Sequence, residues 1–266
     1  MKITGKHIIF SLIIFIGALI LLQGDVGSQE VNIVGSTSIQ PVCEDLVEEY
    51  KKSHPNIRIN VQGGGSNMGI KSVNADIADI GMCSKDICEN NSFTQYELGS
   101  EGIIIGVHPS NNISDLSTED IEKIFSGNIT NWNQLGGENQ KINVFVREEG
   151  SGTLDAFKTA VMNKTPIRSD AIIFNSQGSL KQAIMQDENA VGILSYSYLD
   201  NTVKALEVDG VYPSDDSIAN KSYVIQRPFL FLINNDEKNE AQEFIKWLNS
   251  SEATKILEDN KIIGGD

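Results

Sequence analysis

The feature of this 266-residue sequence that most constrains its fold is the alternation of short apolar runs with stretches of helical periodicity. Val31–Val34 is typical of a buried strand, and the apolar residues of Pro41–Lys52 recur at helical spacing. Asn56–Val61 alternates apolar and polar residues, as a half-buried strand does. The apolar run Ile142–Val146 again precedes a helical stretch, Thr153–Met162. This order predicts an α/β fold in which helices flank mixed sheets.

Two extended stretches far apart in the sequence indicate two lobes rather than consecutive domains. Gly102–Pro109 is an apolar strand that ends in turn residues, and Tyr223–Phe231 is another extended stretch. Strands placed in this way predict crossovers, in which the chain leaves one lobe and returns to it later. We therefore expect residues 29–107 and 228–266 to form lobe one, and residues 108–227 to form lobe two.

The formal net charge of −15 argues against nucleic-acid binding, because a chain this acidic repels DNA, RNA and anionic lipid. No run of Lys and Arg offsets this charge. A chain of this kind that binds an anion needs a local site of aligned donors, since its overall field does not attract such a ligand.

The N-terminus carries a targeting signal. Lys2 and Lys6 precede the apolar run Ile8–Leu22, whose 15 residues are fewer than the roughly 20 that a spanning helix needs. Small residues follow up to Ser28. This pattern predicts that residues 1–28 are a signal peptide, with an uncleaved N-terminal anchor as the alternative. Either interpretation places the protein outside the cytoplasm, in the periplasm or on the extracellular face of the membrane.

The three cysteines are Cys43, Cys83 and Cys88, and an odd number argues against a complete disulfide framework. In an oxidising compartment Cys83 and Cys88 could pair. All three could equally be small buried hydrophobic residues.

Three segments share one local plan, in which a strand is followed by a turn of Gly, Ser and Thr and then by a helix. They are Gly35–Ser38, Gly63–Ser66 and Gly150–Thr153. A helix N-terminus presents unpaired N–H groups and a partial positive charge, and glycine allows a ligand to approach closely. Any single turn could be an ordinary N-cap. Three such turns, with Arg147 able to bond two oxygens of a tetrahedral anion, predict an anion-binding site.

Motifs for catalysis fail on their spacing. Gly64–Met68 approaches a nucleophile elbow, but Met68 stands where glycine is required. No Gly-x4-Gly-Lys-Ser/Thr phosphate loop and no Gly-x-Gly-x-x-Gly motif after a strand occurs. His7, His54 and His108 have no spacing typical of metal ligands. We therefore expect a binding protein without catalytic residues, metal or cofactor.

Taken together and in order, these motifs resemble one family, the phosphate-binding proteins (PstS) of the phosphate ABC transporter. The resemblance covers the sequence from Val31 onward. The segments that carry it are Gly35–Pro41, Gly63–Ser66, Ala78–Lys85, Ile124–Trp132, Arg147–Thr153 and Val191–Tyr196.

The resemblance implies a two-lobe, periplasmic-binding-protein-like fold of type II, with phosphate in the cleft between the lobes. The phosphate-binding positions that it implies are Thr37, Ser38, Ser66, Ser84, Arg147, Ser151, Gly152 and Thr153. Glu149 matches an acid that holds the arginine side chain in place. Ser84 departs from the pattern, since some members have an Asp there that accepts the proton of the phosphate dianion and repels sulfate. A serine can donate as well as accept.

The resemblance thus implies an extracytoplasmic solute-binding protein that captures inorganic phosphate for ABC-type import and acts as a monomer with membrane permease subunits. Closure about hinges near Val107–Ser110 and Val224–Pro228 would complete the site. Other tetrahedral oxyanions (sulfate, molybdate or tungstate) remain an alternative ligand class. From other classes of protein, a surface hydrolase of phosphate esters and a tethered sensor or adhesion domain remain alternatives.

Overall fold

The computed structural model describes residues 29–87, 93–234 and 239–264. The predicted leader, residues 1–28, and Cys88 lie outside this range. Cys43 and Cys83 are buried as free thiols, and burial raises the pKa of Cys83 to about 11. Within the described residues, no helix combines the length and apolar character that crossing a membrane requires.

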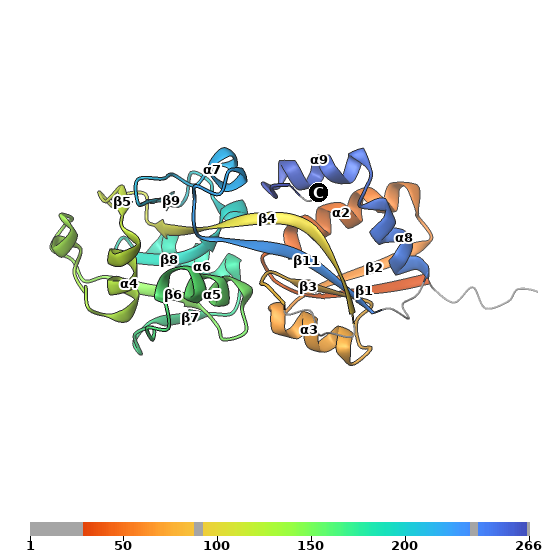
Figure 1. The fold of residues 1–266 in the computed structure, drawn as a ribbon, viewed down its shortest axis with the longest axis horizontal. Coiled ribbons are helices and arrows are strands. Elements are labelled where there is room, and N and C mark those ends of the chain that lie inside the picture. The colour runs from red at the N-terminus through yellow and green to blue at the C-terminus, as the bar shows by residue number, and fades with distance from the viewer. Residues whose placement is uncertain (1–28, 88–92, 235–238, 265–266) are drawn as a thin grey trace, which may run out of the picture.

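The fold has two lobes that lie side by side (Figure 1). The first lobe begins with β1 (Gln29–Gly35), α2 (Gln40–Ser53), β2 (Ile57–Gly63), α3 (Ser66–Asn74) and β3 (Ile80–Cys83). The long strand β4 (Phe93–Val107) then leads into the second lobe. The chain returns through β11 (Gln226–Asn234) and ends with α8 (Asn239–Trp247) and α9 (Ser251–Asp259) on the first lobe.

The second lobe comprises the elements between β4 and β11. They are β5 (Asp115–Leu116), α4 (Thr118–Ser126), η1 (Trp132–Leu135), β6 (Asn143–Arg147), α5 (Gly152–Phe157), η2 (Lys158–Met162), β7 (Ile172–Phe174), α6 (Gln177–Gln186), β8 (Ala190–Ser195), η3 (Tyr196–Tyr198), β9 (Lys204–Ala205), β10 (Glu207–Val208) and α7 (Asp215–Ala219).

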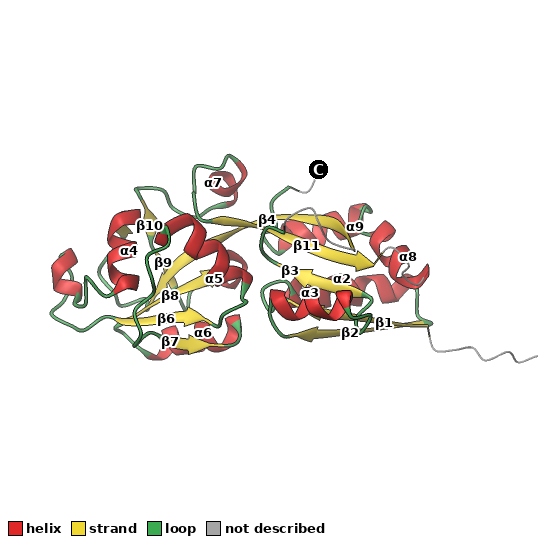
Figure 2. Cartoon of the chain, turned by 60° about the horizontal axis from the view of Figure 1, so that its bottom comes forward, coloured by secondary structure: helices red, strands yellow, loops and turns green. Residues whose placement is uncertain are grey.

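The strands of both lobes follow one path of hydrogen-bonded neighbours, in the order β2-β1-β3-β11-β4-β8-β6-β7. In the first lobe β1 is parallel to β2 and β3, and β11 is antiparallel to β3. In the second lobe β6 is parallel to β7 and β8, and β8 is antiparallel to β4. Strands β4 and β11 connect the two lobes (Figure 2). The parallel strands end at turns that face the other lobe, and those turns carry the predicted anion-binding residues.

Each lobe has its own hydrophobic core, and the division between the cores differs from the expected boundary. Strand β4 pairs with β11 up to Gly102, and from Ile103 to Val107 it pairs with β8. The side chains of Ile103, Ile105 and Val107 accordingly pack in the core of the second lobe. The first crossover therefore lies at Gly102/Ile103, five residues before the predicted end of lobe one.

Most of the predicted elements are present, with shifted ends. The strand predicted within Gly102–Pro109 begins earlier, at Phe93, and ends at Val107. The helix predicted at Thr153–Met162 is α5, which continues directly into a π-helical turn, η2. The N-cap of α6 is Ser176, whose side chain accepts a hydrogen bond from the Ser179 N–H.

Helix α3 should tolerate no side chain at Gly69. A Cβ there would lie 2.6 Å from the Met82 carbonyl oxygen and 2.9 Å from that of Val34, so β1 and β3 would have to move. We expect Gly69→Ala to lower the free energy of unfolding by about 1–3 kcal/mol, although alanine favours helix formation. The control is Gly178→Ala in α6, where a Cβ meets nothing within 4 Å. Urea unfolding should show that only the Gly69 variant loses stability.

Candidate anion-binding site

The first lobe contributes three serines from three different strand ends. Ser38 lies in the turn after β1, Ser66 opens α3 after β2, and Ser84 follows β3. All three are buried. The Ser84 hydroxyl lies 3.2 Å from that of Ser66 and 2.8 Å from that of Ser36, and the Ser84 N–H donates to Ser66 Oγ at 3.0 Å. The turns after β1, β2 and β3 therefore converge on one cluster of hydroxyl groups.

The second lobe faces this cluster with the start of α5. Ser151 is the N-cap, and Gly152 and Thr153 are the first helical residues. The Thr153 hydroxyl lies 3.4 Å from the Ser38 hydroxyl across the cleft, and a Cβ on Gly152 would lie 2.2 Å from the Ser84 carbonyl oxygen. The first N–H groups of a helix have no acceptor within the helix, so this end of α5 offers donors at the junction of the lobes.

Thr37, the remaining predicted position of the first lobe, has a buried hydroxyl without a hydrogen-bond partner. Its carbonyl oxygen accepts a 3.1 Å bond from the Tyr198 hydroxyl of the second lobe. Buried hydroxyl groups without partners are rare in folded proteins. The unpaired Thr37 hydroxyl is therefore available to a ligand.

Arg147 ends strand β6 and is 1% exposed. Its Nε and Nη2 donate to both carboxylate oxygens of Glu148, at 3.0 and 3.1 Å, and to the carbonyl oxygens of Phe174 and Asn175. These bonds fix the orientation of the guanidinium group.

The prediction that Glu149 holds Arg147 is wrong. The Glu149 carboxylate is 80% exposed and pairs with Lys158 at 2.5 Å. The residue that holds the guanidinium is its direct neighbour, Glu148. Beyond the end of β6 the chain turns, with the Ser151 N–H donating to the Glu148 carbonyl oxygen, and this turn points the two acids in different directions.

The main component that the sequence did not reveal is a second buried arginine, Arg227, paired with Glu101. The two residues are cross-strand neighbours on β11 and β4, and Arg227 Nη2 lies 2.9 Å from Glu101 Oε2. Arg227 Nη1 donates to the hydroxyls of Ser84 at 3.2 Å and Thr153 at 2.5 Å, which belong to opposite lobes. Its Nη2 also donates to the Ser195 hydroxyl.

Gln177, the first residue of α6, is a second component that the sequence analysis missed. Its side-chain NH2 group donates to the hydroxyls of Thr153 at 2.6 Å and Ser38 at 3.3 Å. The segment Asn175–Gly178 repeats the plan of a strand, a polar turn and a helix, and this signal could have identified it. Glu101 and Arg227 left a fainter signal, as charges just before the apolar runs Ile103–Ile105 and Phe229–Ile233.

The pKa shifts of neighbouring side chains show that both guanidinium groups act on one region of the cleft. Burial lowers the pKa of Arg227, the carboxylate of Glu101 opposes this fall, and the positive charge of Arg147 adds to it. Burial raises the pKa of Tyr198 to about 12, the carboxylate of Glu101 adds to this rise, and the positive charges of Arg147 and Arg227 oppose it. Two buried cations therefore act on the same part of the cleft, and each is balanced by a carboxylate.

The lobes are in contact in this structure. Lys85 forms an ion pair with Asp155 across the cleft at 2.7 Å, and the Asn67 N–H donates to the Gly150 carbonyl oxygen at 3.2 Å. These bonds, with those of Tyr198 to Thr37, describe a closed arrangement.

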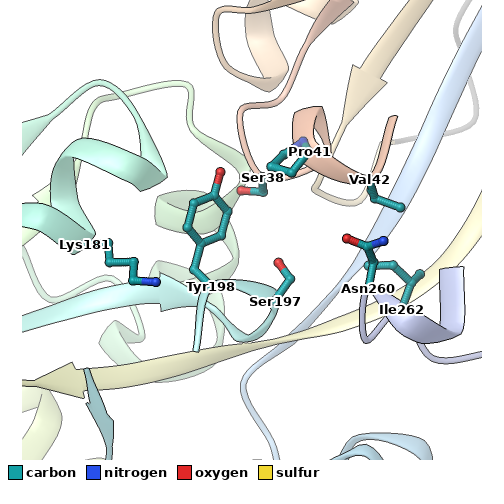
Figure 3. Close-up of a pocket in the computed structure, with 8 residues that line it drawn as sticks. All are labelled: Ser38, Pro41, Val42, Lys181, Ser197, Tyr198, Asn260 and Ile262. Atoms are coloured by element: carbon teal, nitrogen blue, oxygen red, sulfur yellow. The ribbon is translucent and has the colours of Figure 1, made fainter. Parts of the chain in front are cut away.

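A small pocket of about 160 Å³ opens beside the hydroxyl cluster, with which it shares Ser38. In Figure 3, Ser38 and Pro41 line it from the first lobe, and Tyr198 and Lys181 line it from the second. Ser197, another lining residue, donates to Glu101 through both its N–H and its hydroxyl. The pocket thus ends against residues that hold the buried ion pair. No group of three or more His, Cys, Asp or Glu that could hold a metal occurs among the described residues.

The fold and the cleft define a class of protein, the two-lobe binding proteins. Residues 23–252 match the sequence family described as the PBP superfamily domain. Among solved structures, a substrate-binding protein assigned to a phosphate ABC transporter, with bound phosphate, from Clostridium perfringens is 34% identical. It has a TM-score of 0.86 over 89% of this chain and 100% of that chain. An ABC-type phosphate transport receptor from Vibrio cholerae is also 34% identical, with a TM-score of 0.73 over 88% of this chain and 100% of that chain.

A curated relative narrows the assignment further. The phosphate-binding protein PstS of Bacillus subtilis (strain 168) is 31% identical over 237 residues, which are 86% of this chain and 78% of the relative. The chain therefore belongs to the phosphate-binding protein (PstS) family within the PBP superfamily.

The two acids after Arg147 provide a matched pair for mutagenesis. Glu148→Gln removes the charge that balances a buried guanidinium, so we expect the free energy of unfolding to fall by about 1–3 kcal/mol. Glu149→Gln removes an exposed ion pair, and we expect a change within about 0.5 kcal/mol. Thermal and urea unfolding of both variants would measure these effects. A larger loss for the Glu149 variant would contradict the assignment of Glu148 as the partner of Arg147.

Proposed function

We propose that this protein captures inorganic phosphate between its lobes and delivers it to the permease subunits of an ABC importer. The observation that carries the proposal is the cluster of buried donors that both lobes contribute to one cleft. It contains serine and threonine hydroxyls, a helix N-terminus and two arginines. The related phosphate-binding proteins, one of them crystallised with phosphate, support the choice of anion.

The proposed phosphate ligands are the positions expected from the sequence. They are Thr37, Ser38, Ser66, Ser84, Arg147, Ser151, Gly152 and Thr153. Hydroxyl and backbone donors suit a dianion in a site where both arginines already have carboxylate partners, because aligned dipoles stabilise the anion without adding a net charge to the interior.

Capture by closure follows from where these groups lie. The donors are split between two lobes that β4 and β11 connect, so opening the cleft separates them and closing it assembles them. The Lys85–Asp155 pair and the Tyr198 bond to Thr37 join opposite lobes and stabilise the closed form. In this mechanism the permease recognises that closed form.

The proposal includes export and action as a monomer. Residues 1–28 would direct the chain out of the cytoplasm, either as a cleaved signal peptide or as an anchor. The donor cluster serves binding rather than turnover, because phosphate is taken up and released unchanged.

Calorimetric titration of the leaderless protein with phosphate tests the proposal directly. We expect one phosphate per chain, and Arg147→Ala should weaken binding by about 2–5 kcal/mol because it removes one charge of a buried site. Arg58→Ala, at an exposed arginine, is the matched control and should leave the affinity unchanged. Tighter binding of sulfate, molybdate or tungstate would support the site assignment but identify a different anion as the solute. No binding of any of these anions would overturn the proposal.

The closed arrangement predicts a strict size limit at Gly152. A Cβ at this position would lie 2.4 Å from the Ser84 hydroxyl oxygen and 2.2 Å from the Ser84 carbonyl oxygen, so Gly152→Ala prevents full closure. We expect phosphate affinity to fall by about tenfold or more. The compaction that phosphate produces in small-angle X-ray scattering should also be lost. Gly178→Ala, where a Cβ has free space, is the control. Unchanged affinity and compaction in the Gly152 variant would refute this role.

A further inference from the structure

We infer that Arg227 and Gln177 are positioning residues that make the Thr153 hydroxyl an obligate donor toward the bound anion. The inference rests on the proposed function, because it concerns the same cleft. It assigns a role to two side chains that need not touch the ligand.

The first step is the orientation of Arg227. Glu101 accepts from Arg227 Nη2 with one carboxylate oxygen, and its other oxygen accepts from Ser197 N at 2.9 Å and Ser197 Oγ at 2.5 Å. Glu101 and Arg227 are both fully buried as side chains. The carboxylate is thus held on both sides, and it fixes the guanidinium so that Nη1 points at Ser84 and Thr153.

The second step is the orientation of the Gln177 amide. The Ser195 N–H donates to Gln177 Oε1 at 3.1 Å, so this atom must be the amide oxygen. The NH2 group then has to face Thr153 and Ser38, where its two bonds are found. Gln177 therefore acts only as a donor toward the cleft.

Thr153 is the point at which both residues act. Its hydroxyl oxygen accepts from Arg227 Nη1 at 2.5 Å and from Gln177 Nε2 at 2.6 Å. A hydroxyl group has two acceptor lone pairs and one proton, so both lone pairs are occupied and the proton has to be donated elsewhere. The only other hydroxyl bonded to it in the described residues is that of Ser38, at 3.4 Å, beyond the usual range for such a bond. An anion between the lobes is the better acceptor.

Arg227 also contacts Ser84, on the other lobe. The Ser84 hydroxyl oxygen accepts from Arg227 Nη1 at 3.2 Å, which occupies one lone pair and leaves the other, with the proton, for Ser36, Ser66 or the anion. One guanidinium nitrogen thereby contacts a hydroxyl from each lobe. It does so only when the cleft is closed, because Ser84 and Thr153 belong to opposite lobes.

A double-mutant cycle for phosphate affinity tests this coupling. Thr153→Val keeps the shape and removes the hydroxyl, and we expect binding about tenfold weaker or more. Gln177→Met removes the amide donors without changing the charge, and we expect binding several-fold weaker, of the order of one hydrogen bond. Because Gln177 acts mainly through the Thr153 hydroxyl, the double variant should bind within about threefold of Thr153→Val alone. Thr153→Ser, which restores the hydroxyl, should restore both the affinity and its dependence on Gln177.

A second cycle pairs Arg227→Lys with Thr153→Val and keeps the test independent of how well the Gln177 variant folds. Lysine keeps the charge beside Glu101, but one ammonium group cannot reproduce the two-nitrogen fork. In this cycle too, we expect the double variant to lose less phosphate affinity than the product of the two single losses. If the losses of phosphate affinity multiply in both cycles while the wild type binds phosphate, the inference is wrong and the proposed function stands. If the wild type binds no phosphate, both are wrong, and the calorimetry of the wild type alone separates the two cases.

Discussion

The antiparallel pairing of β4 with β11 is the constraint on which the rest of the structure depends. These are the strands that carry the chain between the lobes, and they bring Glu101 and Arg227 face to face at the crossover. A buried ion pair is a poor source of stability, since desolvation of both charges offsets most of their attraction. Its value here is positional: it places a fixed cation at the base of the cleft, within reach of side chains from both lobes.

The acidity of the chain explains why the site has this form. With a net charge of −15, the protein repels anions at long range, and only a local array of donors can hold one. The two buried arginines add little net charge to this array, because each is balanced by a neighbouring acid, Glu148 or Glu101. Because both charges are already balanced, holding the proposed anion also depends on the direction of the hydroxyl and backbone dipoles, which the surrounding hydrogen bonds determine.

The sequence predicted the parts of the site that depend on local structure. A strand, a glycine-containing turn and a helix define their own geometry within about ten residues, so the turns containing Ser38, Ser66 and Thr153 could be recognised and do converge. The pairing of Glu101 with Arg227 could not be predicted in this way. The partners are 126 residues apart in the sequence, and only the register of the sheet places them opposite each other. Glu148 was missed for a different reason, since neighbouring acids in a turn differ in direction and not in residue type.

Ser84 shows why residue identity alone does not determine specificity. Considered alone, a serine where some family members have an acid weakens the case for selecting a protonated anion, since a hydroxyl can either donate or accept. In this fold Arg227 donates to the Ser84 hydroxyl, which occupies one of its two lone pairs. The same guanidinium donates to Thr153, so one residue on the connecting strand contacts a hydroxyl of each lobe. Under the proposed function, selectivity among tetrahedral anions would depend on the hydrogen-bond network around the cleft, and substitutions beyond the ligand contacts would change it.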